Sequence, residues 1–331
     1  MESFRALLVD KTAEGHFARE TVERQLDDLP EGDLLIDVRY SSLNYKDALS
    51  ATGNPGVTRK FPHTPGIDAA GVVLSSNNSE FSVGQEVLVT GYDLGMNTPG
   101  GFGQRIRIPS DWAIPLPSGM SLKQSMLLGT AGLTAALCVD KLQRMDLTPA
   151  DGPVLVTGAT GGVGSVAVML LVKLGYSVTA VTGKRHQEGF LRQLGASEVL
   201  SREVLTESNP RPLGAETWAG AVDTVGGVPL SNILKTLSYG GSVAACGLVS
   251  SPSFEATVLP FILRNINLLG VDSVELPREV KNAMWQKLAG EWKLEGLDAL
   301  LQPLSFDTLS DAIDRILAGE MVGRGVLDLA A

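Results

Sequence analysis

The stretch Val154-Leu-Val-Thr-Gly-Ala-Thr-Gly-Gly-Val-Gly164 decides the fold, because it reads as a buried strand, a glycine-rich turn and the start of a helix. Its core, from Ala159 to Gly164, is the G-x-G-x-x-G pattern with alanine in place of the first glycine. That pattern gives a tight turn, a bare backbone where a pyrophosphate approaches, and close packing of helix on strand. The following helix points its free N–H groups at the phosphates. The stretch therefore predicts a dinucleotide-binding turn formed by Thr160, Gly161, Gly162, Val163 and Gly164.

Strands and helices alternate on both sides of this turn. The apolar pattern predicts strands at 154–156, 177–181, 221–224, 242–245 and 267–271, and helices at 125–142, 163–174, 186–194, 229–237 and 258–265. Buried apolar strands that alternate with helices are typical of a doubly wound parallel sheet in an α/β fold. In a chain of 331 residues, this region fills one of two expected domains.

The two ends of the chain have a different pattern of predicted elements. Short apolar runs at 6–9, 34–38, 69–74, 86–90 and 104–108 lie between glycine and proline turns, which predicts a small, irregular β-barrel. The C-terminal part adds predicted helices at 277–290 and 307–318 and a strand at 326–329.

The end of the second strand in the α/β region indicates which dinucleotide binds. A site for NAD usually places Asp or Glu about 20 residues after the turn, on the ribose 2′-hydroxyl. No acidic residue occurs from 165 to 187, and the strand runs into Thr182-Gly183-Lys184-Arg185. A hydroxyl, a backbone N–H and a cation suit a 2′-phosphate, so the sequence predicts NADPH, bound by Thr182, Gly183 and Lys184. The competing interpretation is a solvated basic loop.

Composition excludes several other classes of protein. Hydrophobic residues make up 44% of the chain, which excludes disorder, and a net charge of −10 disfavours nucleic acid and anionic membranes as general partners. The uncharged stretch 152–172 is long enough to span a bilayer, but its glycine cluster favours a strand, a turn and a helix over a membrane span. The N-terminal residues have no signal-peptide pattern, so we expect a cytoplasmic protein.

The few cysteines and histidines indicate neither a disulfide framework nor a metal site. The chain has two cysteines and three histidines, and no pair of them has the spacing of zinc ligands. We expect Cys138 and Cys246 to be small core side chains, and His63 and His186 to lie in exposed loops.

Further motifs follow in a fixed order along the chain. They are Ser41-Ser-Leu-Asn-Tyr-Lys-Asp-Ala-Leu49, Pro65-Gly-Ile-Asp68, Gly84-Gln-Glu-Val-Leu88, Gly129-Thr-Ala-Gly132, and the stretches 218–226, 239–248, 260–265 and 270–273. With these motifs and the glycine turn, the chain resembles the medium-chain dehydrogenase/reductase superfamily over essentially its whole length. Within it, the chain is most similar to the zinc-free quinone-oxidoreductase branch and its NADPH-dependent acrylyl-CoA reductases.

The resemblance implies an architecture and an activity. A GroES-like barrel is formed by residues 1–124 and 273–331, with a Rossmann domain inserted at 125–272. Zinc-dependent cousins carry Gly-His-Glu where this chain has Gly66-Ile67-Asp68, so chemistry on a zinc alkoxide is not expected. The implied activity is NADPH-dependent reduction of the C=C bond of a short α,β-unsaturated acyl-CoA, with acrylyl-CoA as the substrate. The alternatives are a quinone or general activated-alkene reductase, and a structural protein that binds NADPH, as some lens crystallins of the superfamily do.

The resemblance also implies catalytic candidates. Asn44, Tyr45 and Asp47 belong to the segment at the nicotinamide end of the site. Tyr45 either contacts the nicotinamide or hydrogen-bonds the substrate carbonyl. Asp47 is either catalytic or a cap for the helix that follows.

A second set of residues is carried over by the same motifs. Arg202 is expected to border the adenine, and Arg324 to close the cleft. The residues expected near the nicotinamide ribose and amide are Leu248, Ile262 and Ser273. The strand at 267–271 is apolar on both faces, which predicts that it pairs with a second copy in a homodimer.

Overall fold

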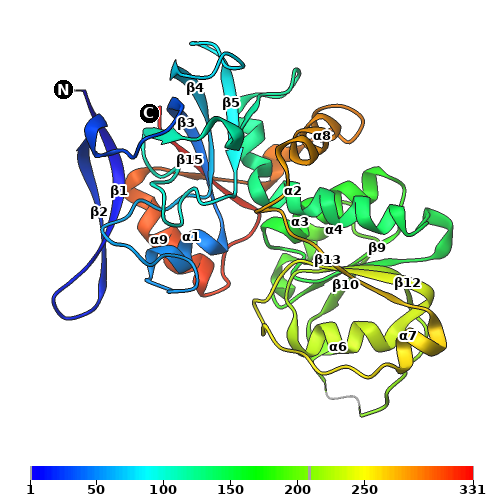
Figure 1. The fold of residues 1–331 in the computed structure, drawn as a ribbon. Helices are drawn as coiled ribbons and strands as arrows, with labels where there is room; N and C mark the ends of the chain where they lie inside the picture. The colour runs from blue at the N-terminus through cyan, green and yellow to red at the C-terminus, as the bar shows by residue number, and fades with distance from the viewer. Residues whose placement is uncertain (1, 208–209, 331) are drawn as a thin grey trace. The chain divides into compact units, whose positions relative to one another are not determined.

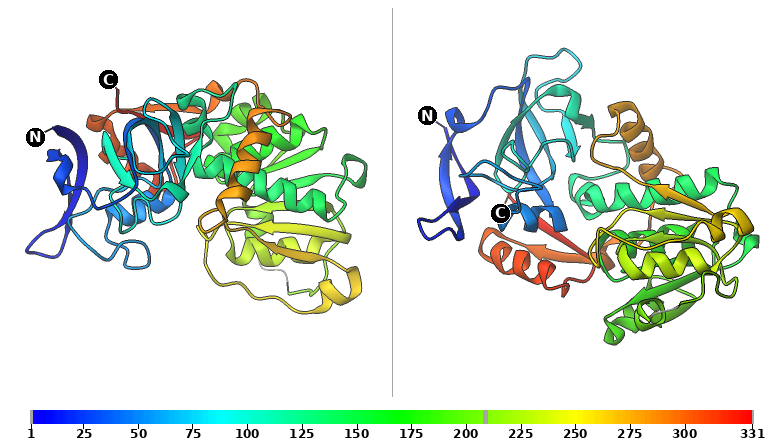
Figure 2. Two further views of the ribbon diagram at one scale, coloured as in Figure 1. Left: turned by 45° about the horizontal axis from the view of Figure 1, so that its top comes forward. Right: turned by 60° about the horizontal axis from the view of Figure 1, so that its bottom comes forward.

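The computed structural model of the protein describes residues 2–207 and 210–330 and divides into two compact units. The first unit contains the chain up to Thr130 together with Val274–Gly290 and the residues from Glu295 onward. The second unit contains Ala131–Ser273 and Glu291–Leu294. Figures 1 and 2 show the ribbon from three directions.

The second unit is built around a six-stranded sheet in which every strand is parallel to its neighbours. Its order is β10-β9-β8-β11-β12-β13, or 3-2-1-4-5-6 when the strands are counted along the chain. This is the order of doubly wound dinucleotide-binding folds, so the predicted sheet is confirmed. The strands are β8 (Val154–Val156), β9 (Val178–Thr182), β10 (Glu198–Ser201), β11 (Trp218–Asp223), β12 (Leu237–Ala245) and β13 (Asn267–Gly270).

Helices cover both faces of this sheet, and α3 and α6 lie on opposite sides of it (Figure 1). Apolar side chains of the strands, among them Leu155, Val181 and Val243, pack against Leu230 and Ile233 of α6 in one buried cluster. The helices are α3 (Gly162–Lys173), α4 (Glu188–Gln193), α5 (Glu203–Thr206), α6 (Gly227–Thr236) and α7 (Leu259–Arg264).

The first unit is mainly β, as the apolar runs predicted. Its main sheet has the order β14-β15-β3-β4-β5-β7, with β6 also paired to β3, while β1 and β2 form a separate two-stranded sheet. Helices α1 (Tyr45–Ala51) and α9 (Phe306–Leu317) pack against each other beside this sheet, and α8 (Arg278–Ala289) follows the return of the chain (Figure 1). The strands are β1 (Ser3–Lys11), β2 (Phe17–Gln25), β3 (Leu34–Leu43), β4 (Asp68–Ser76), β5 (Glu86–Thr90), β6 (Arg105–Ile108), β7 (Ala113–Pro115), β14 (Leu301–Leu304) and β15 (Arg324–Asp328).

Helix α2 (Leu122–Arg144) carries the chain from the first unit into the second, and Gly129 breaks its backbone. Gly129 has φ +54° and ψ −157°, a conformation that suits only glycine. A Cβ there would lie 2.4 Å from both Asp68 Oδ2 and Ser42 Oγ, and 2.8 Å from Arg324 Nη2. The chain passes to the second unit one residue later, whereas the sequence placed the boundary at residue 124. The apolar helical pattern of α2 conceals this break.

A buried lysine fixes the point where the chain returns to the first unit at Val274. Lys281 of α8 is fully buried, and its Nζ donates to the carbonyl oxygens of Thr90 and Val274, both at 2.7 Å. The same ammonium lies 3.3 Å from the centroid of the Tyr92 ring, which adds a cation–π contact. A buried ammonium is tolerated only with such partners, so Lys281 holds the returning segment against the sheet.

Helix α2 is also long and apolar enough to cross a bilayer by length and composition. However, 83% of its most apolar 18-residue window is buried inside the protein, as in the core helix of a water-soluble protein. The uncharged stretch at 152–172 divides into β8, the glycine turn and α3, as the glycine cluster predicted.

Four strands escaped the sequence prediction, namely β2, β10 and the short strands β7 and β14, which have three and four residues. Four of the nine residues of strand β2 are charged and it pairs only with β1, so its apolar signal is weak. Strand β10 has four residues at the edge of its sheet, too few for a period to be visible. All four strands depend on pairing with a neighbour, which a local pattern cannot show.

His63 is buried, which corrects the expectation of an exposed loop residue. It is 3% exposed, its backbone exchanges two hydrogen bonds with Val9, and its ring meets that of Phe61 edge-on at 6.4 Å. Burial lowers the pKa of His63. His186 is exposed and Cys138 is buried, as predicted, whereas Cys246 is only partly buried.

We expect Gly129→Ala to lower the free energy of unfolding by about 2–5 kcal/mol, because backbone strain adds to the clash with Asp68. Gly84→Ala is the control, since Gly84 has φ +86° but no atom within 4 Å of a built Cβ. Gly84→Ala should lower the free energy of unfolding by about 1–2 kcal/mol, from backbone strain alone. Urea unfolding measures both, and equal losses would contradict the crowding at Gly129.

Candidate active site

The glycine turn joins β8 to α3 at the carboxyl edge of the parallel sheet. Among the residues that the structure describes, no side chain caps α3, which begins after Gly161. A Cβ on Gly164 would lie 2.4 Å from the carbonyl oxygen of Gly158, so glycine is required for the helix to pack this closely. The turn therefore has the bare helix N-terminus and the close packing that suit a pyrophosphate.

The turn lies where the strand order reverses, between β8 and β11, and a buried hydrogen-bond cluster ties these two strands together. Thr157 Oγ1 donates to Asp223 Oδ1 at 2.8 Å and accepts the N–H of Thr224 at 2.9 Å. Thr224 Oγ1 donates back to the carbonyl oxygen of Thr157 at 2.9 Å. Burial raises the pKa of Asp223. Doubly wound folds bind their ligands at this reversal point, so the cluster fixes the floor of the predicted dinucleotide site.

Polar side chains gather around Gly183 at the end of β9. Thr182 Oγ1 accepts the N–H of Lys184 at 3.0 Å and lies 3.2 Å from Thr160 Oγ1. The side chain of Arg202 lies over Gly183, with Nε 3.2 Å from the position of a Cβ there. Partial burial lowers the pKa of Lys184, and an anion beside it would offset that cost. Two cations and a hydroxyl at one turn suit a phosphate group.

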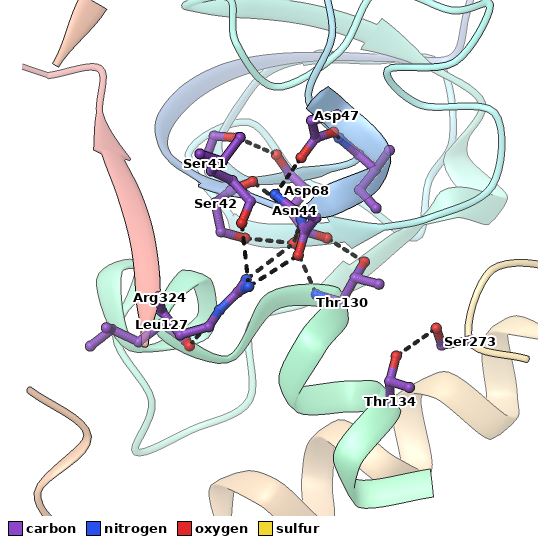
Figure 3. Close-up of polar contacts among 12 residues, drawn as sticks. Ser41, Ser42, Asn44, Asp47, Asp68, Leu127, Thr130, Thr134, Ser273 and Arg324 are labelled. Carbon is purple, nitrogen blue, oxygen red and sulfur yellow. Dashed lines mark hydrogen bonds and ion pairs between the residues drawn. The ribbon is translucent and has the colours of Figure 1, made fainter. Parts of the chain in front are cut away.

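Leu248 and Ser273 follow the carboxyl ends of neighbouring strands in the second unit. Leu248 comes after β12 and is 55% exposed, so its side chain is available to a ligand. Ser273 comes after β13 and is buried, with its Oγ 2.8 Å from Thr134 Oγ1 (Figure 3). The hydroxyl of Ser273 therefore already has a partner within the protein.

Ile262 lies at the opposite edge of the sheet, which corrects its expected place near the nicotinamide. It belongs to the last turn of α7, where Arg264 donates to the carbonyl oxygens of Lys235 and Leu237. Leu237 is the first residue of β12, so this turn lies at the amino ends of the strands. The motif match gave the order of residues along the chain but not the direction in which α7 runs.

In the first unit, Asn44 and Asp47 start helix α1 and thereby place Tyr45. Asn44 is the N-cap, and its side chain accepts the N–H of Asp47. The carboxylate of Asp47 accepts the N–H groups of Asn44 and Ile67, both at 2.7 Å. Asp47 is fully buried and its carboxylate completes the capping box at the third helical position, which agrees with the capping alternative; its catalytic role stays a prediction. Tyr45, the first residue of the helix, is half-buried and stays a predicted catalytic residue.

Burial raises the pKa of Asp47 to about 7, and the neighbouring carboxylate of Asp68 adds to the shift. The two backbone N–H groups oppose it, because they stabilise the ionised form. The Asp47 carboxylate therefore gains its charge near neutral pH.

A buried ion cluster centred on Asp68 surrounds the N-cap (Figure 3). The Asp68 carboxylate accepts hydrogen bonds from Ser42 Oγ at 2.5 Å, from Asn44 Nδ2 at 2.7 Å, and from the N–H and Oγ1 of Thr130 at 2.9 and 2.6 Å. The amide of Asn44 thus has partners within the protein on both its nitrogen and its oxygen, and its catalytic role stays a prediction. The sequence reasoning did not select Asp68 or Thr130; the available signal was an acidic residue opening an apolar strand.

Arg324 belongs to this cluster, which corrects the expectation that it closes a cleft over the cofactor. It is 2% exposed, with Nη2 3.8 Å from Asp68 Oδ2. Its Nε donates to the carbonyl oxygen of Leu127 at 3.2 Å, and its Nη1 donates to Asn44 Oδ1 at 3.1 Å. Burial lowers the pKa of Arg324, while the charge of Asp68 opposes the shift.

Ile67 fills the position where zinc-dependent cousins carry histidine, and its side chain is buried. In the parts of the chain that the structure describes, 2–207 and 210–330, no three His, Cys, Asp or Glu side chains are grouped to hold a metal ion.

Comparisons with known proteins agree with this architecture. Residues 30–118 match the family described as alcohol dehydrogenase GroES-like domain, and residues 162–290 match the family described as zinc-binding dehydrogenase. The chain is 44% identical to acrylyl-CoA reductase AcuI of Ruegeria pomeroyi, over 99% of this chain and 100% of that protein. The chain belongs to the medium-chain dehydrogenase/reductase superfamily.

Two solved members of this superfamily have the same fold. YhdH of Escherichia coli K-12, with bound NADPH, is 43% identical with a TM-score of 0.94, covering 98% of this chain and 99% of that one. YhfP of Bacillus subtilis, with NAD bound, is 43% identical with a TM-score of 0.96, covering 99% and 100%. Both relatives therefore hold a nicotinamide dinucleotide.

The pKa of Asp47 predicts a pH dependence of stability. The folded protein binds one proton more than the unfolded chain between pH 3.8 and about 7, so the free energy of unfolding falls as pH rises through that range. The slope for one group is at most about 1.4 kcal/mol per pH unit. Urea unfolding measures the free energy of unfolding of wild type and of Asp47→Asn from pH 5 to 8. The difference between these two free energies should change with pH up to about pH 7 and stay constant above it. Parallel curves would contradict the assignment.

Proposed function

We propose that this chain is an NADPH-dependent oxidoreductase that reduces the C=C bond of a short α,β-unsaturated acyl-CoA, such as acrylyl-CoA to propionyl-CoA. The observation that carries the proposal is the dinucleotide turn with its basic group around Gly183, in a chain 44% identical to an acrylyl-CoA reductase over its full length. The absence of acidic residues from 165 to 187 supports NADPH as the cofactor.

The residues of the chain fit the parts of this cofactor. The turn from Gly161 to Gly164 and the N-terminus of α3 bind the pyrophosphate, while Thr182, Gly183 and Lys184 bind the 2′-phosphate. Arg202, predicted to border the adenine, lies over Gly183 and so also reaches this phosphate. When bound, NADPH supplies the hydride that adds to the β-carbon of the substrate. Negative charge then develops on the thioester oxygen, and the hydroxyl of Tyr45 donates a hydrogen bond to it. The α-carbon takes its proton from water or from a nearby acid.

Reduction of quinones or other activated alkenes is the second candidate. The quinone oxidoreductase of Sus scrofa is 28% identical over 66% of this chain, so the same scaffold serves a protein of that name. Steady-state rates of NADPH oxidation with acrylyl-CoA, free acrylate and 1,4-benzoquinone separate the candidates. We expect acrylyl-CoA to be preferred by kcat/KM. Preference for the quinone would favour the second candidate, and no substrate-dependent oxidation at all would favour a structural NADPH-binding protein.

We also propose that the enzyme is a cytoplasmic homodimer. Strand β13 is the last strand of its sheet among the described residues, and Leu268 on it and Ile262 and Leu263 on α7 are exposed. An apolar sheet edge favours pairing with the same edge of a second copy. Light scattering at micromolar concentration should give the mass of two chains, and the mass of one chain would refute the dimer.

We expect Tyr45→Phe to lower kcat/KM for acrylyl-CoA by about ten- to a thousandfold, because one donor to the developing oxyanion is lost. The dissociation constant for NADPH, measured by fluorescence titration, should change less than twofold. Unchanged kinetics would show that Tyr45 only packs.

We expect Lys184→Ala to raise KM for NADPH by about ten- to a hundredfold and to leave KM for NADH nearly unchanged, because a charge-assisted hydrogen bond to the 2′-phosphate is lost. The neighbouring Arg185 offers a partial substitute, so the double variant with Arg185→Ala should lose more. Lys173→Ala, at the end of α3, is the matched control. Equal use of NADH and NADPH by the wild-type enzyme would overturn this assignment.

A further inference from the structure

Tyr45 is placed by the residue that starts its helix. A residue in the first position of a helix takes its direction from the N-cap, because the cap fixes where the helical backbone begins. Asn44 fills this position with φ −121° and ψ 160°, and the reciprocal hydrogen bonds with Asp47 close the first turn. A helix of seven residues has little stability of its own, so its start must be fixed from outside.

Asn44 is fixed from outside by two charged groups of opposite sign. Its Nδ2 donates to Asp68 Oδ2 at 2.7 Å, and its Oδ1 accepts from Arg324 Nη1 at 3.1 Å. Asp68 comes from β4 and Arg324 from β15, so two strands hold the two ends of one side-chain amide (Figure 3). Only one orientation of the amide satisfies both charges, since the reversed amide would put like partners together.

Stability alone does not account for a charged pair at this place. Asp68 is fully buried and Arg324 nearly so, and both pay the desolvation of a charge in the protein interior. Well-packed apolar residues of similar size often give equal or greater stability than such a pair. A buried hydrogen-bonded cluster with an ion pair does, however, select one arrangement of the chain over its neighbours.

We propose that Asp68 and Arg324 are positioning residues for the reaction, which set the place of Tyr45 by clamping the side-chain amide of Asn44 between their charges. The inference rests on the proposed function only where it says that Tyr45 contacts the substrate. The clamp itself does not depend on that step, and the two are tested separately below.

Asn44→Ser tests the clamp while keeping the cap. Serine is as good an N-cap as asparagine, but its hydroxyl is too short to reach both Asp68 and Arg324. The enzyme is labelled with 3-fluorotyrosine, and the ¹⁹F signal of Tyr45 among the five tyrosines is assigned by its loss in Tyr45→Phe. We expect Asn44→Ser to shift or broaden that signal, to lower kcat for acrylyl-CoA at least tenfold, and to change the dissociation constant for NADPH less than twofold.

Ser41→Ala is the matched control. Ser41 is fully buried and its Oγ donates to the main-chain oxygen of Asp68 at 2.7 Å, so the variant removes a hydrogen bond to the same residue without touching its carboxylate. The Tyr45 signal and kcat should stay as in wild type. If Asn44→Ser does not fold, Asn44→Asp replaces it, because aspartate keeps the cap and the size but presents an acceptor to Asp68. It should displace the Tyr45 signal further.

The double variant Asn44→Ser with Tyr45→Phe separates positioning from a general effect. If the clamp acts through Tyr45, the double variant is no slower than Tyr45→Phe alone. A Tyr45 signal that is unchanged in the position-44 variant overturns the proposal, as does a loss of kcat that multiplies with that of Tyr45→Phe. If Tyr45→Phe keeps full activity but the signal moves, the clamp stands and the catalytic role of Tyr45 fails.

Discussion

The carboxylate of Asp68 is the constraint on which the rest of the first unit depends. It is fully buried, and an ionised carboxylate in that position requires a complete set of donors. The donors come from the end of β3, from the segment before α1 and from Thr130, with the Arg324 guanidinium alongside. Satisfying one charge thus ties three distant parts of the chain, residues 42–44, Thr130 and Arg324, to the start of β4, and it leaves no room for a side chain at Gly129.

The second unit uses the same device with another acid. Asp223 ends β11 and accepts hydrogen bonds from Thr157 Oγ1 and from the N–H of Gly226. It thereby ties the carboxyl ends of β8 and β11 together beside the glycine turn. A turn made of glycines gains little rigidity from its own side chains, so its shape must come from its neighbours. In each unit, then, a buried and hydrogen-bonded acid holds in place a segment that is proposed to meet the cofactor or the substrate.

The sequence was informative where the physics is local. The turn at 154–164 and its flanking strand and helix were predictable because glycine spacing, apolar runs and helix polarity act over a few residues. Arg324 was assigned to a cleft because its partners could not be seen: it meets Asn44 across 280 positions of sequence. The burial of His63 was hidden for the same reason, since it depends on pairing with Val9. For Ile262, the motif gave the position along the chain, but it did not show that α7 runs toward the amino ends of the strands.

The segment Gly66-Ile67-Asp68 shows how a scaffold shared with zinc-dependent cousins serves a different chemistry. Ile67 turns its side chain into the core, while its N–H binds the cap residue Asp47 and its carbonyl oxygen accepts the N–H of Gly91. The carboxylate of the next residue, Asp68, accepts the hydrogen bond of the Asn44 amide. Hydride transfer from a bound dinucleotide requires chiefly that the reacting groups be held in line. Under the proposed clamp, this segment would help to meet that requirement through its hydrogen bonds to Asn44, Asp47 and Thr130, with backbone and carboxylate groups alone.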